Sequence, residues 1–201
     1  MRVGVLASGE GSNLQAILDK VHGRGGVEVV AVASDRSQAR ALARAEAAGV
    51  PTRVFASAEF TDRRQRDAAM AGWLEELSVE LVVLAGYMQL LDPGFLARFP
   101  QRVVNVHPTL HPAFPGIGSV EQAIAYGVKV AGVTVHFVDE GVDTGAIIAQ
   151  RAIPVPEGAD AETLRQALRP LEHELLPAVV AALARGAVTV DPADPRHVRV
   201  A

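Results

Sequence analysis

Short apolar runs alternate with longer amphipathic stretches along the first half of the chain. Runs rich in Val, Leu and Ala predict β-strands at 2–7, 27–34, 52–56, 80–86 and 102–107. Apolar residues at helical spacing, with helix-start residues before them, predict helices at 12–21, 38–48, 62–77 and 93–99. The strand runs are apolar at consecutive positions, which indicates burial on both faces. This alternation predicts a parallel, doubly wound, Rossmann-like sheet.

The pattern changes in the second half. Two strand-like runs, 131–138 and 145–155, are joined by the short loop VDEGVDT, and a long helical stretch follows at 161–185. A connection this short favours an antiparallel pair. We therefore predict one α/β domain over residues 1–190, with a mostly parallel sheet and an antiparallel C-terminal portion. The proline-broken tail 191–201 is expected to be a surface extension.

Composition excludes several classes of protein. The 201 residues are 49% hydrophobic, enough for one continuous core, and the net charge is −4 without a strongly basic half. Nucleic acid and membrane are therefore not expected as partners. The absence of cysteine removes thiolate nucleophiles and cysteine zinc sites. The N-terminal apolar run is short and no run reaches the ~20 residues of a membrane span, so we expect a cytoplasmic protein.

A glycine-rich turn, GEG, lies between the first predicted strand and helix, within the segment 6–18. Glycines let a backbone approach a ligand closely, and the N–H groups at a helix start favour a phosphate. A tight turn followed by the helix-start residue Ser12 is the plain structural alternative. A nicotinamide-dependent reductase is a second functional alternative, because Asp35 at the end of the next strand could hold a ribose. Leu14 counts against it, since a dinucleotide fingerprint has glycine there.

The segment 103–116, VVNVHPTLHPAFPG, places an amide and an imidazole at a strand end and follows them with three prolines. Asn105 and His107 share one face of the strand, because they are two residues apart. Open parallel sheets bind ligands beyond the carboxyl ends of strands, where these groups could stabilise an oxyanion and handle a proton. A histidine satisfied by its neighbours is the alternative. His111 raises a metal site, but the prolines disfavour a helical two-histidine zinc arrangement.

Two further stretches could line a pocket. Acidic side chains crowd the loop of the segment 133–148: Asp139, Glu140 and Asp143. Such an acid can relay a proton or orient a histidine, although a solvated acidic hairpin is commoner. On the adjoining strand, His136 could equally be a core residue. The stretch 84–93, LAGYMQLLDP, could form a slot for a flat ring or pack in the core.

Five motifs occur in one order along residues 2–190: SGEGSNLQAI, VVLAGYM, NVHPTLHPAFPG, VTVHFVDEGVDTGAII and LEHELLP. As a set they resemble the folate-dependent formyltransferases. The resemblance implies transfer of the formyl group of 10-formyltetrahydrofolate to the amine of 5′-phosphoribosylglycinamide, in purine biosynthesis. It implies two small-molecule substrates, no metal, and a monomer or homodimer. Formyl transfer to an amine needs proximity, an oxyanion partner and a proton path, which the strand end could supply.

The resemblance also implies roles for individual residues. Asn105 matches the asparagine that donates a hydrogen bond to the oxyanion, and His107 matches the histidine that stabilises it as a cation. Asp143 matches the aspartate that orients the site and relays protons. The ribonucleotide is expected on Gly11, Ser12, Asn13 and Glu172. The folate is expected on Arg63, Met88, Gln89, Leu90, Leu91, Val138, Asp139, Glu140, Gly141 and Asp143, with Arg63 meeting its glutamate tail.

Three residues depart from the family pattern: Gln89, His111 and Gly118. They bear on the folate contacts and on loop behaviour rather than on the reaction. A methionyl-tRNA formyltransferase would carry an additional basic C-terminal domain, and a formyltetrahydrofolate hydrolase an additional N-terminal domain, so neither is expected. A formyltransferase with another amine acceptor is the main alternative.

Overall fold

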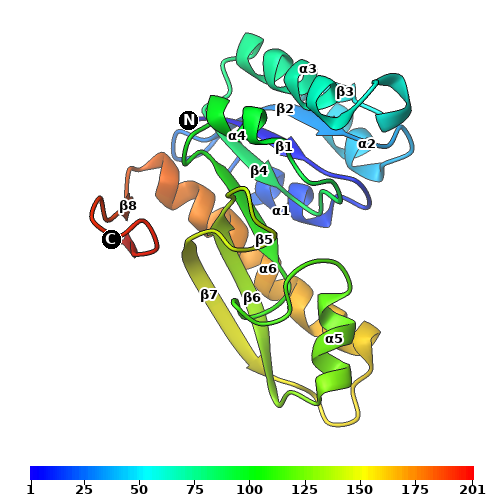
Figure 1. Cartoon of the computed structure of the whole chain (residues 1–201), viewed down its shortest axis with the longest axis vertical. Coiled ribbons are helices and arrows are strands. Elements are labelled where there is room, and N and C mark those ends of the chain that lie inside the picture. Colours follow the sequence, from blue (N-terminus) through cyan, green and yellow to red (C-terminus); the bar gives the residue numbers. More distant parts are fainter. The chain divides into compact units, whose positions relative to one another are not determined.

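The computed structural model describes residues 1–201, which form two compact units, Met1–Asn105 and Val106–Ala201 (Figure 1). The strands of the first unit are β1 (Arg2–Leu6), β2 (Glu28–Ser34), β3 (Thr52–Val54) and β4 (Leu81–Leu84), and β5 (Val103–His107) runs across the boundary. Its helices are α1 (Ser12–Lys20), α2 (Arg40–Ala47), the 3₁₀ turn η1 (Ser57–Glu59), α3 (Arg63–Glu76) and α4 (Pro93–Arg98). The second unit contains α5 (Ser119–Tyr126), β6 (Val130–Phe137), β7 (Ile147–Pro154), α6 (Ala161–Ala184), β8 (Val188–Val190) and β9 (Val198–Val200).

The main sheet has seven strands in the order β3-β2-β1-β4-β5-β6-β7, and β8 and β9 form a separate sheet of two. In the first unit, β1 pairs in parallel with β2 and β4, β2 with β3, and β4 with β5. In the second unit, β6 and β7 pair in antiparallel fashion, as do β8 and β9. The predicted α/β class, the mostly parallel sheet and the antiparallel C-terminal portion are confirmed.

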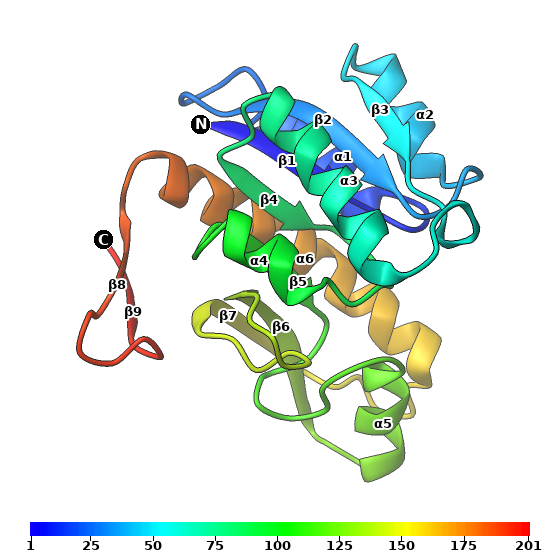
Figure 2. The same ribbon diagram turned by 45° about the horizontal axis from the view of Figure 1, so that its top comes forward.

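The helices of the first unit cover its strands on two sides, with α1 and α2 on one side and α3 and α4 on the other (Figure 2). Right-handed crossovers require this arrangement, because the chain moves outward from β1 to β3 and then returns to β4 and β5. The continuous apolar runs of β1 and β4 are buried between these layers, from Val3 to Leu6 and from Leu81 to Leu84. Their carboxyl ends share one edge, which carries the loops predicted to bind ligands.

Helix starts follow the polar residues that the sequence places before them. Asp62 accepts a hydrogen bond from the N–H of Gln65 at the start of α3, and Asp160 accepts one from Thr163 at the start of α6. Asp92 caps α4, whose first residue is a proline as expected. The predicted helices and strands agree with the observed ones, mostly within two residues at each end.

Four short elements were not predicted: α5, η1, β8 and β9. Helix α5 begins and ends at glycines with φ of 73° and 82°, Gly118 and Gly127, and it has no side-chain cap to mark its start. Strand β9 lies in the proline-broken tail, where its residues pair with β8. The tail therefore contains ordered backbone pairing, while the division of the chain at residue 190 stays a prediction.

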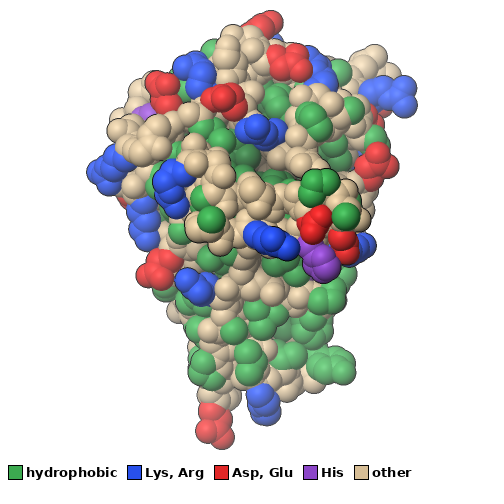
Figure 3. All heavy atoms as spheres, turned by 90° about the vertical axis from the view of Figure 1, so that its left-hand side faces the viewer, with side chains coloured by type: hydrophobic (Ala, Val, Ile, Leu, Met, Phe, Trp, Pro, Cys, Tyr) green, Lys and Arg blue, Asp and Glu red, His purple; other side chains and the backbone are tan.

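On the face of the molecule drawn in Figure 3, acidic and basic side chains are interspersed rather than gathered by sign. This distribution agrees with the small net charge of −4. None of the helices combines the length and apolar character that a membrane crossing requires.

Candidate active site

His107 lies at the end of β5, and both of its ring nitrogens face oxygen atoms of the second unit. Nδ1 is 3.3 Å from Oδ2 of Asp143, and Nε2 is 3.1 Å from the carbonyl oxygen of Phe114. An imidazolium could donate to both oxygens, whereas a neutral imidazole can donate to one. Asn105 lies two residues earlier on the same strand. The structure thus brings together His107 and Asp143, which the sequence placed in separate motifs.

The carboxylate of Asp143 is held from several directions. The N–H of Gly116 donates to Oδ2 at 2.8 Å, and Nε2 of His136 lies 3.6 Å from Oδ1. Burial by itself would raise the pKa of Asp143, but the nearby imidazoles of His136 and His107 and the hydrogen bond from Gly116 outweigh it and hold this pKa well below its usual value. The carboxylate is therefore ionised throughout the pH range in which the protein would work.

Opposing influences act on His107. Burial lowers the pKa of His107, and the nearby His136 acts in the same direction, whereas the Asp143 carboxylate and the Phe114 carbonyl raise it. The net effect lowers the pKa of His107, so the neutral form of its imidazole is favoured in the free protein at neutral pH. A developing negative charge beside the ring would raise this pKa again, because opposite charges favour the ionised form. The side chain can therefore become a cation in response to an oxyanion.

Two more histidines extend this cluster. The ring of His111 packs between those of His107 and His136, with centroid separations of 4.8 and 4.6 Å. Nδ1 of His136 is 2.7 Å from the carbonyl oxygen of Phe137. Burial, followed by the two neighbouring imidazoles, lowers the pKa of His111 to about 4. Sequence reasoning treated His111 as a family departure and His136 as a possible core residue, and the structure places both beside the His107–Asp143 pair.

Close backbone approach fixes the loop that carries Asp143. Asp143 and Phe114 have φ values of 55° and 53°, in the left-handed region that residues with a Cβ adopt rarely and at a cost. A Cβ at Gly145 would collide with the carbonyl oxygen of Phe137, so this position requires glycine. The predicted folate residues 139–141 are exposed in the same loop. Strain at Phe114 and Asp143 is consistent with a functional site, and sequence patterns carry no signal for it.

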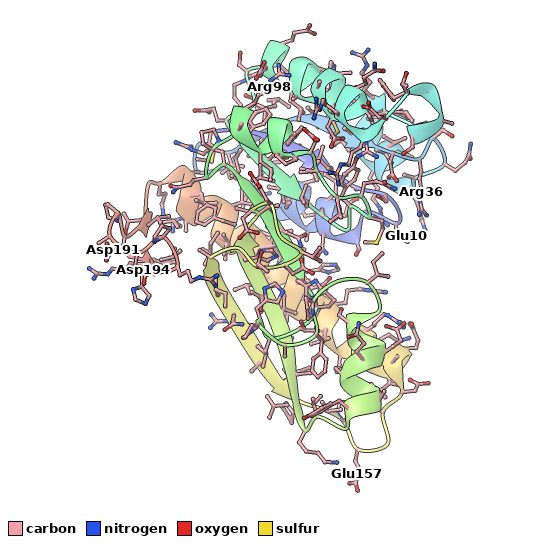
Figure 4. The ribbon with its side chains drawn as sticks, in the orientation of Figure 1. Glu10, Arg36, Arg98, Glu157, Asp191 and Asp194 are labelled. Carbon is pink, nitrogen blue, oxygen red and sulfur yellow. The ribbon has the colours of Figure 1, made fainter.

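The predicted phosphate site lies in the first unit, at the start of α1. Gly11 caps this helix with φ of 71°, and a Cβ there would lie 2.7 Å from the backbone of α2. Ser12 and Asn13 form the first turn, and no side chain caps its N–H groups. Such a helix start can receive an anion. Glu10, labelled in Figure 4, pairs with Arg40 at 3.3 Å on the neighbouring helix.

The predicted pterin segment 88–91 follows β4 in the same unit. The N–H of Met88 donates to Oγ of Ser8 at 2.8 Å, which anchors the segment to the end of β1. Met88 and Leu90 are 51% and 56% exposed. They offer apolar surface that a flat ring could cover, as the predicted slot requires.

A polar network supports this segment from below. Gln89 donates from Nε2 to Asp35 at 3.0 Å and accepts from Arg66 at 3.2 Å. Arg66 and Asp67 form a buried ion pair at 2.8 Å, and Asp67 accepts the N–H of Asp92 at 2.7 Å. Arg66 was missed by sequence reasoning because it belongs to no recognised motif. Asp35 is nearly buried and engaged with Gln89, which disfavours its use as a ribose ligand.

Comparisons with known proteins agree over nearly the whole chain. A model of the formyl transferase family matches residues 1–180. A phosphoribosylglycinamide formyltransferase of Mycobacterium tuberculosis (strain ATCC 25618 / H37Rv) is 48% identical, covering 94% of this chain and 87% of that protein. One from Bacillus subtilis (strain 168) is 42% identical, covering 88% and 91%. The crystal structure of glycinamide ribonucleotide transformylase 1 from Symbiobacterium toebii gives a TM-score of 0.95 at 46% identity, covering 100% of this chain and 93% of that chain.

The chain belongs to the phosphoribosylglycinamide formyltransferases of the formyl transferase family. The resemblance read from the five motifs is confirmed, and the chain is an enzyme of this family. The alternative of a nicotinamide-dependent reductase is set aside, because the Mycobacterium tuberculosis relative matches over 94% of this chain.

The residues predicted for a phosphoribosylglycinamide formyltransferase fall in both units. The first unit holds Gly11, Ser12, Asn13, Arg63, Met88, Gln89, Leu90, Leu91 and Asn105, and the second holds His107, Val138, Asp139, Glu140, Gly141, Asp143 and Glu172. Arg63 begins α3 and is exposed, and Glu172 lies partly buried in α6. Their roles in binding and catalysis stay predictions.

Proposed function

We propose that the chain transfers the formyl group of 10-formyltetrahydrofolate to the amine of 5′-phosphoribosylglycinamide, giving the N-formyl product and tetrahydrofolate in purine biosynthesis. The observation that carries the proposal is the 3.3 Å pairing of His107 with Asp143 in a chain of this family. His107 lies two residues beyond Asn105 on the same strand. The acceptor amine is itself the nucleophile, so the reaction requires no nucleophile or metal from the protein.

The attack of the amine on the formyl carbon converts a carbonyl into a tetrahedral oxyanion. Collapse of this intermediate re-forms the carbonyl and breaks the bond from the formyl carbon to the folate nitrogen, which gains a proton and leaves as tetrahydrofolate, while the acceptor nitrogen loses a proton. Asn105 donates a hydrogen bond to the oxyanion from its side-chain amide. His107 stabilises this oxygen as an imidazolium. The ionised carboxylate of Asp143, which faces Nδ1 of His107, stabilises the positive charge of the ring. The protonated Nε2 of His107 donates to the Phe114 carbonyl oxygen, 3.1 Å away, until the oxyanion, a stronger acceptor, competes for this hydrogen bond.

Separate segments of the chain are assigned to the ribonucleotide and to the folate. The phosphate of the ribonucleotide binds the start of α1 at Gly11, Ser12 and Asn13, where backbone N–H groups and the helix dipole favour an anion. Glu172 contacts the rest of the ribonucleotide. The folate binds at 88–91 and through the backbone of 138–143, and Arg63 meets its glutamate tail.

A coupled set of rate measurements tests this assignment. The purified chain is mixed with 5′-phosphoribosylglycinamide and a 10-formylfolate donor, and the donor's ultraviolet absorbance is followed. Turnover should require both substrates, and Asn105→Ala and His107→Ala should each lower kcat by about 10²- to 10³-fold. His197→Ala is the control, because this histidine is exposed and pairs with Asp194 in the β8–β9 connection at 3.5 Å (Figure 4 labels Asp194).

Each outcome has a distinct meaning. Near-normal rates in both site variants would overturn the assignment of the oxyanion groups. Folate binding without turnover would keep the pocket but move the acceptor to another amine. Failure to bind the folate would refute the proposed function.

A further inference from the structure

His111 is a buried imidazole that the proposed reaction does not use. Its side chain lies between the rings of His107 and His136, and the residue is 7% exposed. Neither of its ring nitrogens has a hydrogen-bond partner. An imidazole buried in this way keeps a lone pair available, and neutral imidazole is the commonest metal ligand in proteins.

The neutral form of His107 also faces the carboxylate of Asp143 unfavourably. If the single proton of His107 lies on Nε2, which is 3.1 Å from the Phe114 carbonyl, then the lone pair of Nδ1 faces Asp143 at 3.3 Å. A lone pair and an ionised carboxylate repel each other at this distance. A cation between them removes the repulsion, and either a proton or a metal ion can supply it.

We propose that His107, His111 and Asp143 form a binding site for a divalent transition metal ion, most favourably Zn²⁺. One ligand atom from each residue can be chosen so that all three lie within 4.8 Å of one another. Ligand atoms about 2.1 Å from a tetrahedral Zn²⁺ are separated by about 3.4 Å. The 3.3 Å between His107 Nδ1 and Asp143 Oδ2 matches that edge. A ring nitrogen of His111 lies within 4.8 Å of the other two ligand atoms and would move closer to them when the ion binds.

Groups around the three ligands already hold them in orientations that suit a metal. Histidine ligands usually donate their other ring N–H to a carbonyl, as His107 can to Phe114. The N–H of Gly116 fixes the Asp143 carboxylate at 2.8 Å. The backbone of His111 is fixed too, because its N–H donates to Thr134 and its carbonyl accepts from a glutamine of β7.

An ion could reach this cluster from the second unit's own surface. A cavity of about 220 Å³ is lined by the loop residues 142–147, which include Asp143, together with His111, Pro112, Pro115 and Arg196. It provides a path from solvent and room for a water molecule as the fourth ligand, since three protein ligands leave one tetrahedral position open.

The ion would compete with the reaction, because a metal on Nδ1 takes the place of the proton that makes His107 a cation. Zn²⁺ should therefore be a reversible inhibitor rather than a cofactor. This consequence rests on the proposed function, whereas the binding itself does not.

The binding experiment uses the full-length chain with Zn²⁺ and Co²⁺ as probes. One Zn²⁺ per chain should bind in competition with a chromophoric chelator, and Co²⁺ should give the intense visible absorption of a four-coordinate ion. His111→Leu should weaken Zn²⁺ binding by at least about 100-fold, since it removes a metal ligand, and loss of a group that only hydrogen-bonds to a ligand already costs about 10- to 100-fold. His111→Gln, which keeps a polar side chain, should weaken it as well, and His197→Leu, on the exposed hairpin, should not.

Circular dichroism establishes that each variant is folded before the comparison is made. Equal Zn²⁺ affinities for the wild type and both His111 variants would overturn the proposal. So would a loss of binding in His197→Leu as large as that in His111→Leu. Absence of one-to-one binding in the wild type would overturn it directly.

The inhibition experiment separates this proposal from the proposed function. Zn²⁺ should abolish formyl transfer by the wild type, a chelator should restore it, and His111→Leu should resist the ion. A chain that gives the Co²⁺ spectrum but no formyl transfer would keep the metal site and refute the proposed function. A chain that transfers formyl groups but binds no ion would keep the proposed function and refute the metal site.

Discussion

Replacing His111 with leucine tests whether this buried imidazole makes the fold sensitive to acid. Burial and two neighbouring imidazoles lower the pKa of His111 from an ordinary value of 6.5 to about 4. In the unfolded chain the ring is solvated and titrates near its ordinary pKa. As pH falls from 6.5 toward about 4, His111 binds a proton in the unfolded state but stays neutral in the folded state. The free energy of unfolding therefore decreases.

The two pKa values set the size of the effect. Stability from the neutral ring is complete above pH 6.5 and is lost as pH falls toward about 4. Between about pH 7.5 and about pH 5 the loss is about 2 kcal/mol, and it approaches about 3 kcal/mol at still lower pH. Leucine has no proton to bind, so His111→Leu should escape this loss. At neutral pH the variant should be about 1 kcal/mol more stable, because two unpartnered buried nitrogens are removed.

Urea unfolding at the two pH values measures this directly, with the fluorescence of Trp73, the chain's single tryptophan, as the probe. The quantity to compare is the difference in unfolding free energy between variant and wild type. It should grow by about 2 kcal/mol on acidification, because the carboxylates titrate alike in both proteins. His197→Leu, on an exposed hairpin, should show no such growth. A difference that stays constant with pH would refute the reasoning that His111 resists protonation in the fold.

Three further outcomes follow from single contacts. Arg66→Met should cost about 3–5 kcal/mol in chemical unfolding, because it leaves the carboxylate of Asp67 buried and unpaired; a loss below about 1 kcal/mol would contradict this. The Asp143 carboxylate raises the pKa of His107 against its burial, so Asp143→Asn should lower the pH at which the His107 signal titrates by NMR, and an upward shift would be the wrong sign. Gly11→Ala should lower the melting temperature, because φ is 71° and the added Cβ would lie 2.7 Å from the backbone of α2; an unchanged melting temperature would show that the loop can relax.

The architecture could be predicted because it depends on local signals. Consecutive apolar residues mark strands covered on both faces, and the acids before α3, α4 and α6 mark helix starts by capping them. Helix α5 was not predicted, because it is flanked by glycines with positive φ, and glycine alone does not distinguish a helix end from a turn. Strand β9 escaped because three residues between prolines and charges carry too little periodicity.

The candidate site could be predicted in its members but not in its contacts. The family resemblance predicts Asn105, His107 and Asp143 as its members; the structure places His107 beside Asp143, and their catalytic roles stay predictions. That the Phe114 carbonyl faces one nitrogen of His107, and that Gly116 fixes Asp143, depends on how a proline-rich loop folds back onto a strand end. Such contacts join residues 7 and 27 positions apart across irregular backbone, where periodicity gives no information.

The cluster around Asp143 is best understood as a site that holds one positive charge. Its carboxylate is ionised, and the imidazoles of His107 and His136 are placed so that either can face it through a ring nitrogen. In the proposed reaction that charge is a proton on His107, and a cation bound beside it would compete with this proton. His111 alters this balance, because its unpartnered nitrogens add a ligand without adding a proton at neutral pH. A leucine there should therefore preserve catalysis while removing both the acid sensitivity and the metal site, and this joint result could not arise if His111 only filled space.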